Sequence, residues 1–457
     1  MSCPTYIPAE PALVSYHDCI KAFRDGSDSP RAFMERCLAI IESLEKGIKA
    51  FTALNIEGAR KAADGATARY KEGRPLSQID GMPIGVKDVI DTADMPTQMG
   101  SPLFNCWRPR FDSASVSALK KAGAVVLGKT VTTEFAAVVP GPTCNPFDRS
   151  RTPGGSSSGS AAAVGIGMLP AGLGTQVIGS ITRPASYCGC FGYKPTVGAV
   201  NRGGSLDYMS QSSQGVLAAS LNDAWAVIYA ISSKVGGDSG YPGLYGEENP
   251  KSACRPDRLI RLGTAGWGKA EERTRQVFED ALDRLQSAGV EIISRRDNTA
   301  IEEYEKAIAK GLDISRKINT WEFHWPLNTF EDRLPGQLSK IMEERLTAAG
   351  EMTLADYRNW IKERDRTRNL HKNLSDIADG FVTLGATGAA PVGLDFTGDP
   401  AFNLPASYIG CPALTLPCLS VDEMPLGIQL MGFTDEDERL FGQARWVEEV
   451  LLRPCQA

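Results

Sequence analysis

Apolar positions recur with helical spacing in several stretches of the chain, and short continuous apolar runs follow some of them. Residues 30–46 and 56–70 carry helical patterns, and the apolar run at 83–86 predicts a short strand that leads to a lysine. A helix expected over 113–121 is followed by an apolar run at 124–127, which predicts a buried strand. A helix followed by a buried strand is the repeating unit of α/β layers.

The same unit returns later in the chain. Residues 271–293 read as a helix that a glycine ends, followed by a strand. Two further apolar strands are expected at 412–417 and 426–431, and a closing helix at 435–452. The alternation predicts an α/β fold in which a sheet lies between helices.

The pattern gives no reason to divide the chain. We expect one domain over residues 1–457, with a helical N-terminal region at about 11–75. The charged stretch at about 300–375 reads as a helical insert over one edge of the sheet. Trp321, Phe323, His324 and Trp325 within it either line a pocket or are packing residues.

Composition removes several classes of protein. The 457 residues include 49 Lys and Arg against 55 Asp and Glu, a net charge of −6, with 42% hydrophobic residues. These values exclude a long disordered chain, a coiled coil and a collagen. Mild acidity argues against a general nucleic-acid binder, which needs a basic face. The 11 scattered cysteines read as reduced thiols, and with no signal-peptide pattern they predict a cytoplasmic protein.

The stretch 153–182 carries no charge over 30 residues, so it has to be tested as a membrane span. It is rich in glycine and serine and lacks the ~20 mostly large apolar residues that a span needs. We read it as a buried segment and expect no membrane partner.

Two motifs in the chain match known patterns but lack the required context. Residues 123–130 match the phosphate-loop pattern, yet the residues between the glycines are Ala, Val, Val and Leu, which favour a strand. Residues 155–159 fit the GxSxG elbow, but no strand precedes them. His17, His324 and His371 offer no convincing base for a Ser-His-Asp hydrolase.

A buried backbone rich in Gly and Ser has N–H groups that can converge on an anion, as an acyl-transfer enzyme requires. A serine beside those N–H groups would be a nucleophile only with a base. Since no histidine is suitable, a buried neutral lysine is the candidate, because desolvation lowers its pKa. Lys87 follows an apolar run that can carry it inward.

Three blocks of the chain resemble the amidase signature family, the serine hydrolases with a Ser-cisSer-Lys triad. They are Gly81-Met-Pro-Ile-Gly-Val-Lys87-Asp88, Pro153-Gly-Gly-Ser156-Ser-Ser-Gly159-Ser and Gly174-Thr-Gln-Val-Ile-Gly179-Ser180-Ile-Thr-Arg183-Pro184. The pattern is most similar to small bacterial amidases of the malonamidase type. The resemblance implies a large central mixed β-sheet flanked by helices on both faces.

The resemblance also implies roles for particular residues. Ser180 matches the nucleophile, Lys87 the base, and Ser156 the bridging serine whose preceding peptide bond is cis. The backbone N–H groups of Val177, Ile178, Gly179 and Ser180 match the oxyanion hole. Neither a metal nor an organic cofactor is expected.

Two positions leave questions open. Most members of the family have a small residue where this chain has Ile178, so either the backbone there stays in an ordinary conformation or the pocket is reshaped. Arg183 either binds a substrate carboxylate, as in malonamidase-like members, or is structural, and we favour the structural role.

The expected function is hydrolysis of the C–N bond of a small amide, other than a peptide bond, through an acyl-enzyme on Ser180. A carbamate or urea-type substrate for the same triad is one alternative. The other is a non-catalytic or weakly active subunit of an amidotransferase-like assembly. We expect a small-molecule amide or carbamate as the partner, no nucleic acid, and a homodimer.

Overall fold

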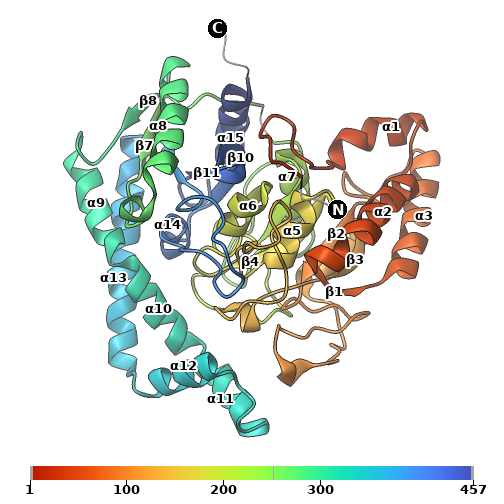
Figure 1. The fold of residues 1–457 in the computed structure, drawn as a ribbon, viewed down its shortest axis with the longest axis horizontal. Helices are drawn as coiled ribbons and strands as arrows, with labels where there is room; N and C mark the ends of the chain where they lie inside the picture. The colour runs from red at the N-terminus through yellow and green to blue at the C-terminus, as the bar shows by residue number, and fades with distance from the viewer. Residues whose placement is uncertain (1–3, 251, 454–457) are drawn as a thin grey trace.

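The computed structural model describes residues 4–250 and 252–453, and within them the chain forms one mixed sheet of 11 strands (Figure 1). The strand order is β1-β3-β2-β4-β6-β5-β10-β11-β9-β7-β8. β2 runs parallel to β3 and β4, β7 runs parallel to β8 and β9, and the other pairs are antiparallel. The strands are β1 Phe51–Leu54, β2 Pro83–Lys87, β3 Val125–Thr130, β4 Ala171–Gln176, β5 Phe191–Lys194, β6 Ser213–Ala218, β7 Arg258–Arg261, β8 Glu291–Ile293, β9 Gly380–Leu384, β10 Ala413–Val421 and β11 Met424–Met431.

Helices cover the sheet on both of its faces, as predicted. Every residue of β2, β3, β4, β5, β6, β9 and β11 is buried, which requires cover on both sides. The α-helices are α1 Ile20–Asp25, α2 Pro30–Ile48, α3 Ile56–Lys71, α4 Ala114–Lys121, α5 Ser158–Gly165, α6 Thr182–Cys188, α7 Leu221–Val235, α8 Glu272–Ser287, α9 Thr299–Ala309, α10 Gly311–Glu322, α11 His324–Arg333, α12 Lys340–Gly350, α13 Leu354–Asn373, α14 Leu404–Ile409 and α15 Asp437–Leu452. Short 3-10 helices lie at His17–Cys19, Pro102–Phe104, Glu134–Ala136, Trp267–Lys269 and Leu374–Asp376.

The N-terminal region differs from the expectation in one element. It contains α1, α2 and α3, but between α2 and α3 the chain forms β1, which pairs antiparallel with β3 and makes one edge of the sheet. Four residues are too few to show a periodic pattern, so the strand is hidden between two stronger helical signals.

The uncharged stretch forms the centre of the fold. It contains α5, all of whose residues are buried, and β4, which is buried as well. A Cβ added at Gly159 would lie 2.2 Å from the Ala50 carbonyl oxygen, and one at Gly165 would lie 2.0 Å from the Cys188 carbonyl oxygen. The small residues are therefore required by close packing of backbone on backbone. Among the described residues, no helix is long and apolar enough to cross a membrane.

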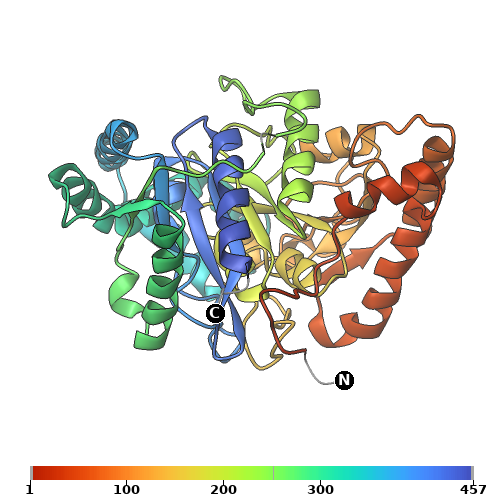
Figure 2. The ribbon, with the colours of Figure 1, turned by 90° about the horizontal axis from the view of Figure 1, so that it is seen from above.

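The predicted insert is helical. Helices α9 to α13 fill this part of the chain, and α10 to α13 extend away from the sheet (Figure 1). Both views place the N-terminal helices and the insert at opposite ends of the sheet (Figure 1 and Figure 2). This arrangement follows the strand order, in which β1 and β8 are the two edges.

Candidate active site

The candidate lysine is the last residue of β2, and its side chain is fully buried. β2 and β4 are parallel neighbours, with Val86 paired to Leu173, so the carboxyl ends of both strands reach the same edge of the sheet. Lys87 and Thr175 lie at this edge. In open α/β sheets, ligands bind beyond the carboxyl ends of the strands.

Two helix N-termini meet the same edge. Ser156 lies two residues before α5, and Ser180 lies two residues before α6. Lys87 Nζ is 2.7 Å from Ser156 Oγ and 2.8 Å from Thr175 Oγ1. The peptide bond between Gly155 and Ser156 is cis, as the family resemblance implies. The structure thus brings the candidate base and the candidate bridging serine into contact.

Burial lowers the pKa of Lys87 to about 7, because an ammonium group at this depth loses its hydration. The opposing influence is the carboxyl of Asp207, whose charge acts to raise the pKa of Lys87. Asp207 is itself buried, its own pKa is raised by burial, and it accepts a hydrogen bond from Ser212 Oγ. At neutral pH an uncharged amine is therefore available at position 87.

The peptide units of residues 177–180 have a consistent orientation. Each of the four carbonyl oxygens accepts a hydrogen bond from a protein donor, whereas none of the four N–H groups donates to another described residue. The donors are Gln211 Nε2 to Val177 O (2.9 Å), Ser407 Oγ to Ile178 O (3.0 Å), Arg183 N to Gly179 O (3.1 Å) and Ser157 N to Ser180 O (3.3 Å). Successive unpaired N–H groups form an anion-binding arrangement.

Ser180 itself is half-buried. Among the described residues, no hydrogen bond joins the hydroxyl groups of Ser156 and Ser180. Catalytic hydrogen bonds are often long in the absence of substrate and shorten when it binds.

Ile178 and Gln176 show how the chain accommodates its departure from the small-residue pattern. The φ angle of Ile178 is not positive, so the backbone there keeps a conformation open to a branched residue. Gln176 Oε1 accepts from the backbone N–H groups of Ile181 (2.8 Å) and Thr182 (2.9 Å), which caps the start of α6. The turn that carries Ser180 is fixed by this side chain.

Arg183 is buried and makes no ion pair within the described part of the chain. Its Nη2 donates to the Gly155 carbonyl (2.6 Å) and to Thr397 Oγ1 (3.2 Å). Nε is buried without a partner among the described residues, and burial lowers the pKa of the guanidinium. The arginine therefore holds the carbonyl of the residue before Ser156.

The other motifs fall outside this site. Residues 125–130 of the phosphate-loop match form β3, and Lys129 is buried against Asp88 at 3.3 Å. His371 stacks on Phe381 and burial lowers its pKa to about 3, so it packs as a neutral ring. His324 lies in the insert, on the wall of a cavity.

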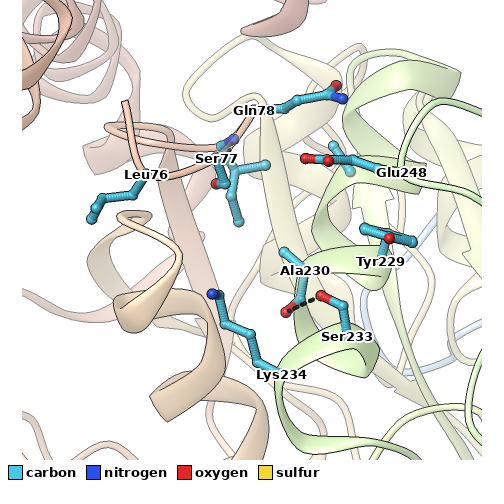
Figure 3. A pocket seen from close by; sticks show the side chains of 10 residues that line it. Leu76, Ser77, Gln78, Tyr229, Ala230, Ser233, Lys234 and Glu248 are labelled. Atoms are coloured by element: carbon cyan, nitrogen blue, oxygen red, sulfur yellow. Dashed lines mark hydrogen bonds between the residues drawn. The ribbon is translucent and has the colours of Figure 1, made fainter. Parts of the chain in front are cut away.

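A separate cavity of about 250 Å³ lies between the loop at 76–79 and α7 (Figure 3). Lys234 and Glu248 lie on its wall, and none of the candidate site residues lines it. This cavity is therefore separate from the candidate active site at the edge formed by β2 and β4.

Comparison with known proteins agrees with the fold. The family model described as Amidase matches residues 32–379. A glutamyl-tRNA(Gln) amidotransferase subunit of Chloroflexus aggregans (strain MD-66 / DSM 9485) is 31% identical over 435 residues, which cover 87% of this chain and 88% of that protein. The native peptide amidase from Stenotrophomonas maltophilia has a TM-score of 0.79 at 27% identity, covering 95% of this chain and 96% of that one. A crystal structure of an amidase has a TM-score of 0.81 at 26% identity, covering 95% and 99%.

These matches define the class of protein as an amide hydrolase of mixed α/β architecture. The chain belongs to the amidase signature family.

Proposed function

We propose that the protein is a serine amidohydrolase that cleaves the C–N bond of a small amide other than a peptide bond, through an acyl-enzyme on Ser180. The observation that carries this proposal is the contact of 2.7 Å between Ser156 Oγ and a lysine amine whose pKa burial lowers to about 7. A neutral amine in contact with a hydroxyl is a general base, which a charged surface lysine is not.

The reaction then runs as a relay. Lys87 Nζ accepts the proton of Ser156, and Ser156 accepts the proton of Ser180 while Ser180 Oγ bonds to the amide carbon. The carbonyl oxygen becomes an oxyanion facing the unpaired N–H groups of 177–180. As the C–N bond breaks, Ser156 gives its proton to the leaving nitrogen and receives one from Lys87. Water attacks the ester with the same groups as base, which frees Ser180.

The contacts of Arg183 support a structural role. Nη2 of this side chain donates to Gly155 O and Thr397 Oγ1 and so stabilises the loop that carries Ser156, whereas Nε and Nη1 have no hydrogen-bond partner among the described residues. We therefore propose a neutral amide as substrate. Carbamates and ureas present the same planar carbonyl to the triad and stay as alternative substrates.

Labelling with a small alkyl fluorophosphonate, which forms a covalent bond to an activated serine, tests the nucleophile. We expect labelling of the native chain and its loss in Ser180→Ala. Ser43→Ala is the matched control, because Ser43 is an exposed serine in an SxxK pattern on α2, and its loss should leave labelling unchanged. A folded native chain that is not labelled would overturn the proposal.

The curated relative named as an amidotransferase component favours a second candidate, a protein that works within an assembly. Ammonia release from short aliphatic amides, carbamates and ureas by the purified chain separates the two. Turnover by the chain alone supports the free-standing hydrolase, whereas labelling without turnover of any of them supports the assembly component.

A further inference from the structure

A cavity of about 500 Å³ lies between the insert and the chain segment 207–212. Its wall combines side chains from that segment with side chains from α10, α11 and α13. They are Tyr208, Ser210, Trp321, Glu322, His324, Trp325 and Tyr357. Large aromatic side chains in a concave wall with a few polar groups are typical of a small-molecule site.

The segment 207–212 is shared between this cavity and the candidate active site. Tyr208 and Ser210 line the cavity, whereas Gln211 donates to the carbonyl of Val177 and Ser212 donates to that of Gln176 (3.3 Å). Consecutive residues of one segment thus contact the cavity and the oxyanion peptides. The cavity and the 177–180 turn are therefore linked through segment 207–212.

Two aromatic rings of the cavity stack on each other and two are exposed. Trp321 and Tyr357 stack on each other at 5.7 Å between ring centres. Tyr208 is 41% exposed and Trp325 is 72% exposed, values that are high for side chains of this size. Such rings gain by covering one another or a flat ligand, in offset or edge-to-face contact.

The one carboxylate on the wall already has its donors. Glu322 Oε2 accepts from the Ser210 N–H (2.7 Å), and Oε1 accepts from the Ser210 hydroxyl and from Tyr357 OH (2.8 Å). Arg364 Nη1 donates to the same Ser210 hydroxyl at 2.8 Å. The carboxylate is therefore engaged in holding segment 207–212 against the insert.

A second positive charge lies near the wall. The guanidinium of Arg345 on α12 lies 4.8 Å from the ring centre of Phe323, and burial lowers the pKa of Arg345 to about 10, so it stays charged at neutral pH. Its Nη2 donates to the Asn319 carbonyl (2.8 Å), and it has no ion-pair partner among the described residues. With Arg364 and Arg345 around a single engaged carboxylate, a cationic ligand is disfavoured.

We propose that this cavity is a substrate subsite that binds a neutral, flat aromatic group of the amide whose C–N bond is cleaved at Ser180. The inference rests on the proposed function, because it assigns the non-reacting part of that substrate. The substrates are then amides that carry an aryl group, and Trp321 is the central residue that selects them.

The test compares amides that differ in the group carried by an otherwise constant chain. Ammonia release is measured for benzamide, phenylacetamide, 3-phenylpropionamide and 4-phenylbutyramide, which place the ring at increasing distance from the carbonyl. 3-Cyclohexylpropionamide and 3-(trimethylammonio)propionamide replace the ring by a non-flat and by a cationic group. We expect kcat/KM to peak at one phenyl chain length, and to be about tenfold lower for both replacements than for 3-phenylpropionamide, whose chain length they share.

Substitutions locate the preference. In Trp321→Ala, the ratio of kcat/KM for the best phenyl amide to that for propionamide should fall about tenfold. Trp325→Ala should lower the ratio in the same direction, and because Trp325 is largely exposed this variant folds even if Trp321→Ala does not. Phe111→Ala removes an aromatic ring that is 79% exposed elsewhere and should leave the ratio unchanged.

Titration calorimetry separates the two proposals. It measures the binding of 3-phenylpropionamide and its homologues to the Ser180→Ala variant, which cannot form the acyl-enzyme. If adding Trp321→Ala to the Ser180→Ala variant weakens this binding, the subsite is supported, even where fluorophosphonate labelling fails and the hydrolase proposal falls. The subsite alone would be overturned by three results together. The native chain is labelled, kcat/KM is equal for the phenyl and cyclohexyl amides, and the ratios are unchanged in both tryptophan variants.

Discussion

The state of Lys87 can be tested through the pH dependence of the reaction. An unperturbed lysine has a pKa near 10.5, so at pH 7 only about one molecule in three thousand would carry a neutral amine. Burial lowers the pKa of Lys87 to about 7, so about half of the molecules carry one. The fold therefore increases the population of the active base at pH 7 by about a thousandfold.

The assay is kcat/KM for a neutral amide measured from pH 5 to pH 10. We expect kcat/KM to rise about tenfold per pH unit below pH 7 and to level off above it, because only the neutral amine accepts a proton. In Lys87→Met the rising limb should disappear together with most of the activity. Lys129→Met is the matched control, since Lys129 is equally buried but contacts Asp88 and the Ile90 carbonyl instead of a serine.

A rising limb near pH 10 would refute the assignment, because it would mean that burial does not lower the pKa of Lys87. Loss of the limb in Lys129→Met as complete as in Lys87→Met, with both variants folded by circular dichroism, would refute it as well.

Three further predictions concern two glycines and the stability effect of Lys87. Gly179→Ala adds a Cβ 2.9 Å from Asn403 Cβ, which should displace the oxyanion N–H groups and lower kcat about a hundredfold with little change in KM, measured by steady-state kinetics. Gly159→Ala places a Cβ 2.2 Å from the Ala50 carbonyl oxygen, and urea unfolding should show a loss of about 3 kcal/mol in unfolding free energy. Burial lowers the pKa of Lys87 from about 10.5 in the unfolded chain to about 7 in the folded chain, so the lysine destabilises the folded state below pH 10.5. Lys87→Met removes this cost and should raise the unfolding free energy at pH 7 by about 4 kcal/mol. That advantage should shrink as the pH approaches 10.5; equal gains at pH 7 and pH 10, or a loss at pH 7, would contradict it.

The main features of the fold could be predicted because their signals are local. The strand that carries Lys87 and the helices α2, α3 and α8 follow from apolar spacing and from glycine or cap residues nearby in sequence. The sheet order could not be derived this way, because β5 lies between β6 and β10 through contacts between distant segments. β1 escapes prediction because four residues between two helices leave no periodic signal.

The candidate site divides in the same way. The motif blocks point to Lys87, Ser156 and Ser180, whereas Gln211 and Ser407, which hold the carbonyls of Val177 and Ile178, lie in no motif. They reach the site only through the fold, so neither composition nor spacing marks them. The behaviour of Ile178 was equally open, since a side chain does not reveal which φ its neighbours impose.

The match to the family model stops at residue 379, yet the turn that bears the candidate nucleophile is anchored from beyond it. Ser407 Oγ donates a hydrogen bond to the Ile178 carbonyl of that turn. Thr397 Oγ1 accepts a hydrogen bond from Arg183, which also binds the loop that carries Ser156. A chain synthesised only as far as residue 379 therefore contains Lys87, Ser156 and Ser180, but it lacks the two residues whose hydrogen bonds hold their loops in place. Active-site titration with a serine-reactive probe should accordingly count only full-length folded molecules, and not shorter chains that already contain all three residues.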